Sequence, residues 1–248
     1  MSKSKTTATP AASVWGLEGH VASAACRGVR LDLAHPSAGL VTTTGDHLLG
    51  LDLGLDPGQE RPPVDRWVRG DDITATWEPG DERELRATGL WRQLHLPAID
   101  GPRVAGGGTG VVAWELIASA TTRLLRADST LAVTSDLDVG SVLMAAWERG
   151  VPLPFLPGID PHKGLVLVRR SRAPSVLLML HPSDHQAVSV ERCGERTRIG
   201  CWLFPTGVEK GVLLRSRVLA AIGPAEGDMT WAADLATWFA ASPPELAT

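Results

Sequence analysis

The stretch GLVLVRRSRAPSVLLMLHP, residues 164–182, decides the fold more than any other segment of the chain. Its two continuous apolar runs, 165–168 and 176–180, are bounded by glycine or proline. Runs of this length are typical of strands that are covered on both faces. The segment therefore predicts two strands in the middle of a layered β structure.

Shorter patterns on both sides of this stretch also predict strands. Leu49, Leu51 and Leu53 share one face of a strand, and turn residues follow them. Apolar and polar residues alternate in 29–33, 72–78, 85–94, 131–134, 198–203 and 208–222. Many short strands separated by glycine and proline indicate an all-β fold, an antiparallel β-sandwich.

Two segments could form helices. Residues 111–125 fit either a strand or a helix, and their β-branched residues favour the strand. Residues 229–241 fit a helix that Asp228 or Thr230 caps and that Ser242 and two prolines end. We expect this C-terminal helix to pack on a sheet, residues 1–13 to form a disordered tail, and residues 14–248 to form a single β-sandwich domain.

Composition excludes several classes of protein. The 248 residues include 26 Gly, nine Trp and no Tyr, and the net charge is −4, which excludes collagen-like and coiled-coil chains. The sequence has neither a signal-peptide pattern nor a run of 18 apolar residues, so we expect a cytoplasmic protein with no membrane partner. A pI near 6.0 argues against nucleic acid as a main partner.

Familiar chemical motifs are weak or missing. The glycine cluster at 106–110 lacks the spacing of a phosphate-binding loop, and we interpret it as a flexible connection. His181, Asp184 and His185 include metal-ligating residue types, but they follow an apolar strand in a turn, so we predict no metal site and no cofactor. No nucleophile motif accompanies the three cysteines, so no catalytic residue is predicted.

One predicted hairpin combines tryptophan with charged side chains. Its candidate ligand-binding residues are Trp67, Arg69, Asp71, Trp91 and Arg92. Sugar rings stack on aromatic planes, and charged groups hydrogen-bond to their hydroxyls. We therefore expect a possible saccharide ligand at this hairpin, although tryptophan is also a good core residue.

Two alternatives remain open. Residues 44–84 hold eleven acids and four arginines, whereas 163–217 hold four acids and ten bases, so charged sheet surfaces could join copies of the chain into a homo-oligomer. The same basic segment could hold an anionic polysaccharide. A sugar-active epimerase or lyase would instead use His95, His181, His185 and the carboxylates near Asp71 as acid–base groups.

No motif identifies a family. In architecture alone, the long antiparallel strands and the hairpin rich in Trp and Arg resemble the large β-sandwiches of the galactose-mutarotase-like class. The resemblance implies a large sandwich fold and transfers no functional residue, because one fold hosts many functions.

Overall fold

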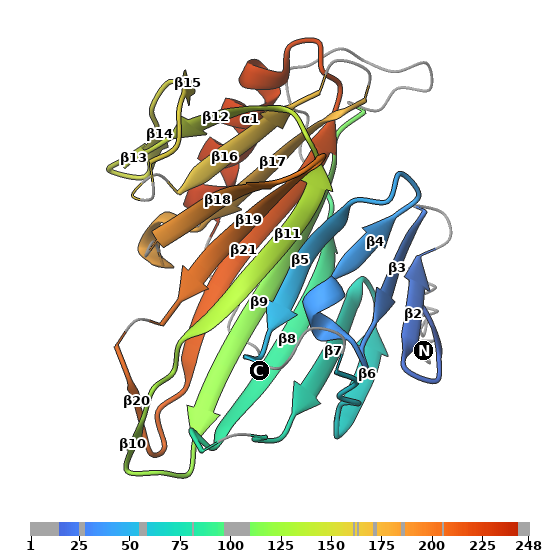
Figure 1. The fold of residues 1–248 in the computed structure, drawn as a ribbon, viewed down its shortest axis with the longest axis vertical. Coiled ribbons are helices and arrows are strands. Elements are labelled where there is room, and N and C mark those ends of the chain that lie inside the picture. Colours follow the sequence, from blue (N-terminus) through green and yellow to red (C-terminus); the bar gives the residue numbers. More distant parts are fainter. Residues whose placement is uncertain are drawn as a thin grey trace, which may run out of the picture.

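Two antiparallel β-sheets pack face to face, and one C-terminal helix covers part of the second sheet (Figure 1). The computed structural model describes residues 15–24, 28–54, 59–80, 82–96, 110–160, 162, 164–170, 173–184, 187–204 and 206–242. The predicted antiparallel sandwich with a helix packed on a sheet is confirmed. The galactose-mutarotase-like class and the single-domain boundary stay predictions, and residues 1–13 lie outside the described residues.

The front sheet, which faces the viewer in Figure 1, has eight strands. In spatial order they are β1 (Gly16–Glu18), β2 (Val21–Ala24), β3 (Val29–Asp32), β4 (Leu40–Thr42), β5 (His47–Asp52), β11 (Leu131–Asp138), β19 (Arg196–Leu203) and β18 (Ala187–Cys193). The 3₁₀ turn η2 (Pro36–Ala38) connects β3 to β4.

The back sheet has nine strands. In spatial order they are β15 (Leu156–Pro157), β12 (Ser141–Ala145), β16 (Leu165–Arg169), β17 (Ser175–Leu180), β21 (Leu214–Gly223), β9 (Val112–Thr122), β8 (Leu85–Leu94), β7 (Asp72–Trp77) and β6 (Asp65–Arg69). The shorter elements are β10 (Arg126–Ala127), which pairs with β20 (Val208–Glu209), β13 (Trp147–Glu148), which pairs with β14 (Val151–Pro152), and the 3₁₀ turn η3 (Pro182–Asp184).

The main hydrophobic core lies between the two sheets. Trp77 and Trp91 are two of its largest side chains, with ring centroids 6.1 Å apart and planes nearly perpendicular. This edge-to-face arrangement suits the aromatic quadrupoles. Trp77 and Trp114 are buried as predicted, so much of the tryptophan excess fills the core.

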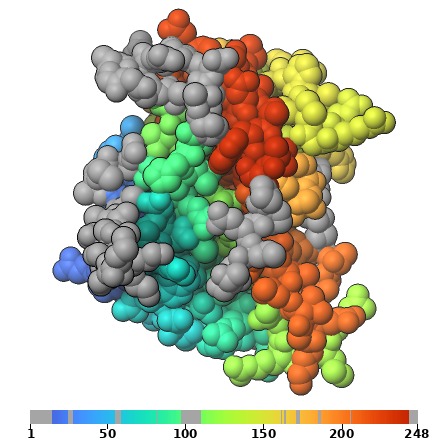
Figure 2. Space-filling model, turned by 180° about the vertical axis from the view of Figure 1, so that it is seen from behind, coloured from blue at the N-terminus to red at the C-terminus, as the bar shows by residue number. Residues whose placement is uncertain are grey.

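A second core lies between the back sheet and helix α1 (Asp228–Ala241), which Figure 2 shows in red across the sheet. Trp231, Leu235 and Phe239 are wholly buried against outward side chains of β16, β17 and β21. The two apolar runs therefore have one face on each core. This explains why their sequence is continuously apolar rather than alternating.

Three local details differ from or refine the expectations. Residues 112–122 form the strand β9, which resolves the strand-or-helix ambiguity. The segment 208–222 is divided into β20 and β21 by a turn. Asp228 does not cap α1, because Gly227 occupies that position; its carboxylate instead accepts hydrogen bonds from Arg169 and Ser175. In the part of the chain that the structure describes, no helix is long and apolar enough to cross a membrane.

Candidate functional site

The outer face of the front sheet carries a groove of about 890 Å³. The groove lies over β5, β11, β19 and β18, with η2 at one side (Figure 1). Most of its lining residues have polar or charged side chains, in contrast to the helix-covered face of the back sheet. This hollow is therefore our candidate functional site.

Three rows of outward-facing residues cross the strands in and beside the groove, because directly opposite residues of neighbouring strands share a face. The charged row is His47, Asp136, Arg198 and Glu191. The small row is Gly50, Thr134, Gly200 and Ser189. The tryptophan row is Asp52, Ala132, Trp202 and Ala187.

The residues of the small row have short side chains, so they leave space in the middle of the groove floor. A Cβ added at Gly200 would lie 2.7 Å from Ser189 Oγ, so a larger residue there would have to displace the Ser189 side chain. Trp202 is 47% exposed, and its neighbours across the strands, Ala132 and Ala187, are too small to cover its ring. Four residues separate the charged row from the tryptophan row along β11 and β19, which is about 13 Å.

A β-bulge in β5 places His47 on the groove side of the sheet. Thr134 pairs with Gly50, but Asp136, two residues further along β11, pairs with His47. β5 thus has one residue more than β11 over this interval, and this reverses the alternation of its side chains. Leu48 and Leu49 are both fully buried, and Leu49 has a φ of 55°, which is strained for a residue other than glycine. Without the bulge, Leu48 would face the groove.

Two imidazoles beside η2 are anchored through the same ring atom. His47 Nδ1 lies 3.1 Å from the carbonyl oxygen of Ala38, and His35 Nδ1 lies 3.3 Å from Asp32 Oδ2. A carbonyl oxygen can only accept, so His47 must carry its proton on Nδ1. Nε2 of the neutral ring can then accept a hydrogen bond from a ligand.

η2 can lie against β5 only because two glycines remove side chains from the contact. A Cβ at Gly50 would be 2.1 Å from Ser37 O, and one at Gly39 would be 2.2 Å from Leu48 O. Gly39 also has a φ of 64°. These glycines bring the carbonyl of Ala38 within reach of His47 and form the side wall of the groove.

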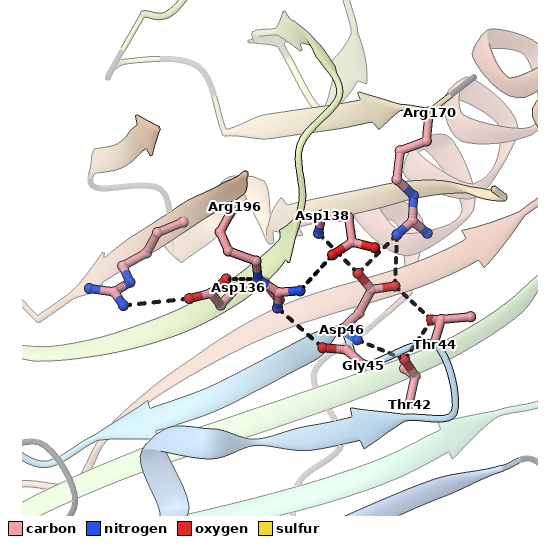
Figure 3. A network of polar contacts seen from close by, with 9 residues as sticks. Thr42, Thr44, Gly45, Asp46, Asp136, Asp138, Arg170 and Arg196 are labelled. Carbon is pink, nitrogen blue, oxygen red and sulfur yellow. Dashed lines mark hydrogen bonds and ion pairs between the residues drawn. The ribbon is translucent and has the colours of Figure 1, made fainter. Parts of the chain in front are cut away.

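Arg196 ties one end of the groove together (Figure 3). Its guanidinium donates to Asp136 Oδ1 at 2.6 Å, to Asp138 Oδ1 at 2.7 Å and to the carbonyl oxygen of Gly45 at 3.2 Å. Burial alone would lower the pKa of Arg196, but the hydrogen bonds and charges of Asp136 and Asp138 outweigh it and raise the pKa. Arg196 is therefore occupied, whereas Arg198 is 3.4 Å from Asp136 and its side chain is 56% exposed.

A buried ion pair lies next to the Arg196 network (Figure 3). Nη1 of Arg170 lies 2.9 and 2.8 Å from the two carboxylate oxygens of Asp46, and both side chains are almost fully buried. Asp46 also accepts from Thr44 Oγ1 and from the backbone N–H of Asp138. The pair therefore fixes the β4–β5 turn to the end of β11 and to the loop after β16.

The predicted ligand-binding residues of the hairpin lie on the back sheet and not in this groove. Trp67 is 41% exposed on β6, and Arg69 is exposed at the end of that strand. Arg92 is held by Asp72 with hydrogen bonds of 2.6 and 2.8 Å. Asp71 Oδ2 lies 2.6 Å from Nε2 of His95. Asp71 and Arg92 thus lie near the same end of the β7–β8 hairpin. Asp71 is paired with His95, and Arg92 is paired with Asp72.

Trp91 lies in the core and offers no face to a ligand. Its register partner Ile73 and its β9 neighbour Leu116 point between the sheets, and all three are wholly buried. Trp67 pairs with Thr74, one register position away, so it points outward. A shift of one residue reverses the face, which is why sequence patterning left the position of Trp91 open.

His181 belongs to a different environment, beneath the end of α1. Its ring packs edge-on against Phe239, and burial lowers its pKa, with the charge of Arg217 adding to this and Asp184 opposing it. Arg217 in turn donates to Glu115 and to the carbonyl oxygen of Ser242. His185 lies outside the described residues, and no group of three metal-ligating side chains occurs among those described.

The basic residues of 163–217 that the structure describes do not all lie on one surface. Arg169 pairs with Asp228, Arg170 with Asp46, Arg196 with Asp136, and Arg217 with Glu115. Arg172 lies outside the described residues. Within the described chain, these paired arginines point to different layers of the sandwich, which weakens the expectation of a basic face for a polyanion.

Comparisons with known proteins add no further constraint: the chain matches no protein-family model, and a search of curated proteins finds no significant match.

Sequence reasoning missed the groove because β5, β11 and the hairpin of β18 and β19, which supply its residues, are distant from one another in sequence. Trp202, His47 and His35 belong to no motif that the sequence shows. The local alternation of Arg198, Gly200 and Trp202 did indicate an outward face. What could not be read was that Asp136 and Glu191 lie beside it.

Proposed function

We propose that this protein binds a saccharide in the groove of the front sheet. The observation that carries the proposal is the half-exposed indole of Trp202 at one end of a polar groove, between two alanines. An uncovered aromatic plane is the surface on which the apolar face of a sugar ring stacks. A second sugar ring, next to the ring on Trp202 in the direction of the strands, would then lie over the small row.

The polar groups of the groove suit hydroxyls better than a polyanion. Three carboxylates, those of Asp52, Asp136 and Glu191, face two guanidiniums, those of Arg196 and Arg198. Charges are therefore nearly balanced when the histidines are neutral. Carboxylates and the Nε2 atoms of His35 and His47 accept hydrogen bonds, and arginine donates them. The span of about 13 Å favours a neutral saccharide of more than one ring.

The proposal is tested by calorimetric titration with neutral and acidic oligosaccharides. Trp202→Ala is expected to abolish binding that the wild-type protein shows. The matched control is Trp67→Ala, because Trp67 is exposed to a similar degree on the other sheet. Loss of binding in the Trp67 variant alone would assign the ligand to the hairpin of Trp67, Arg69, Asp71 and Arg92. Absence of binding at millimolar concentrations would contradict the proposal.

Two other hypotheses from the sequence have separate tests. A homo-oligomer held by charged sheet surfaces would dissociate as salt screens its contacts, which light scattering at rising ionic strength measures. An epimerase or lyase that uses His95, His181 and Asp71 together is disfavoured by their positions, since His95 and Asp71 pair at the strand end and His181 packs beneath α1. A cytoplasmic location stays a prediction from the sequence.

A further inference from the structure

The bulge residue Leu49 has both of its backbone polar groups bonded to side chains. Its N–H donates to Ser135 Oγ at 3.1 Å, and its carbonyl oxygen accepts from Trp91 Nε1 at 2.9 Å. Both hydrogen bonds are buried between the sheets. A bulge takes backbone groups out of the strand ladder, and buried groups of this kind must find other partners. Ser135 and Trp91 are those partners.

The position of the Trp91 ring is itself fixed. A Cβ added at Gly89 would lie 2.6 Å from the ring of Trp91, so the indole occupies the space above a residue that has no side chain. On its other side the ring meets Trp77 edge-to-face. The indole N–H of Trp91 is therefore aimed at β5 by the packing of the core, and it reaches across from the back sheet to the front sheet.

The bulge decides which residue of β5 faces the groove. With it, His47 lies opposite Asp136 in the charged row; a regular strand would place Leu48 there. The left-handed conformation of Leu49 is unfavourable for leucine and persists only when its surroundings hold it. The hydrogen bonds from Trp91 and to Ser135 supply that support.

We infer that Trp91 is a positioning residue that holds the Leu49 bulge from inside the core and thereby presents His47 to a ligand in the groove. This inference rests on the proposed function for the identity of the ligand. The positioning of the imidazole can be measured without any ligand, because the hydrogen bond to the carbonyl oxygen of Ala38 favours the tautomer of the neutral His47 ring that carries the proton on Nδ1.

The experiment compares Trp91→Phe and Ser135→Ala with the matched control Trp231→Phe. Trp231 is also wholly buried, and its Nε1 also donates to a backbone carbonyl at 2.9 Å, but it belongs to α1 and packs against the other face of the back sheet. Long-range ¹H–¹⁵N NMR spectra report which nitrogen of His47 is protonated. Calorimetry then measures the dissociation constant for a neutral oligosaccharide that the wild-type protein binds.

Trp91→Phe and Ser135→Ala are expected to move the His47 proton from Nδ1 towards Nε2 and to raise the dissociation constant about tenfold, the effect of losing one good hydrogen bond. Trp231→Phe should change neither quantity. Ser135→Ala removes a single hydroxyl, so it keeps the test valid if Trp91→Phe does not fold.

Folded variants in which His47 keeps its Nδ1 proton would overturn the inference, and so would variants with a displaced proton but unchanged affinity. If the wild-type protein binds no saccharide, the proposed function fails. The protonation state of His47 then decides by itself whether Trp91 positions it.

Discussion

The two outer faces of the sandwich are both formed by antiparallel strands, but their side chains differ in polarity and only one face is covered by a helix. On the back sheet, the outward residues of β16, β17 and β21 that form the second core are leucine, methionine and alanine, and α1 covers them. On the front sheet, the outward residues of β11 and β19 are polar or small except for Trp202, and they line an open groove. Both sheets are built from the same kind of strand. The outward-facing residues decide which face is left for a ligand: apolar ones are covered by the helix, and polar or small ones stay open.

The largest effect is expected where the groove meets the core, at the buried ion pair of Asp46 and Arg170. Arg170→Met should lower the free energy of unfolding by about 3–5 kcal/mol, because it leaves a buried carboxylate without its counter-charge. Urea denaturation measures this loss. Asp46→Asn/Arg170→Met should lose less than the sum of the two single variants. Strictly additive losses would show that the pair does not act as a unit.

The covered face is tested by Leu235→Ala, which removes a wholly buried side chain between α1 and the back sheet. The free energy of unfolding should fall by about 2–5 kcal/mol, since a cavity remains. Trp202→Ala, on the open face, should change it by less than about 0.5 kcal/mol. Comparable losses from the two variants would contradict the distinction between a structural face and a binding face.

His181 provides a pH-dependent test of the covered face. Burial lowers its pKa in the folded protein from 6.5, so the unfolded chain binds the proton more readily. Its contribution to stability is therefore complete above about pH 6.5 and decreases as the pH falls below that value, by at most about 1.4 kcal/mol per pH unit. Urea denaturation at several pH values measures this slope. His181→Asn should flatten it, and an unchanged slope would assign the effect to other groups.

The smallest effect is expected on the open face itself. Arg198→Gln should change the free energy of unfolding by less than about 0.5 kcal/mol, because an exposed ion pair such as Arg198–Asp136 stabilises little. Thermal denaturation at low and high salt measures the change. A loss above 1 kcal/mol would mean that Arg198 belongs to the structural network of Arg196.

Much of the fold could be predicted because its strands follow local rules. The runs at 165–168 and 176–180 indicated strands covered on both faces, and α1 supplies the second cover. The sequence also placed Asp71 and Arg92 in one predicted hairpin, whereas the pairs Asp72–Arg92 and Asp71–His95 were found only in the structure. The groove could not be predicted, because its rows join β5, β11, β19 and β18, and strand order cannot be read from alternation.

Trp91 and His47 mark the boundary between sequence and structure most clearly. By itself, the sequence determined that Trp91 lies in a strand, that another strand follows closely after His47, and that the chain forms an antiparallel sandwich with a C-terminal helix. Only the tertiary structure decided their faces, because one extra residue in β5 reverses the alternation, and a hydrogen bond from Trp91 to Leu49 crosses between the sheets. Pairing register and bulges depend on partners far away in the chain, and local patterning contains no information about them.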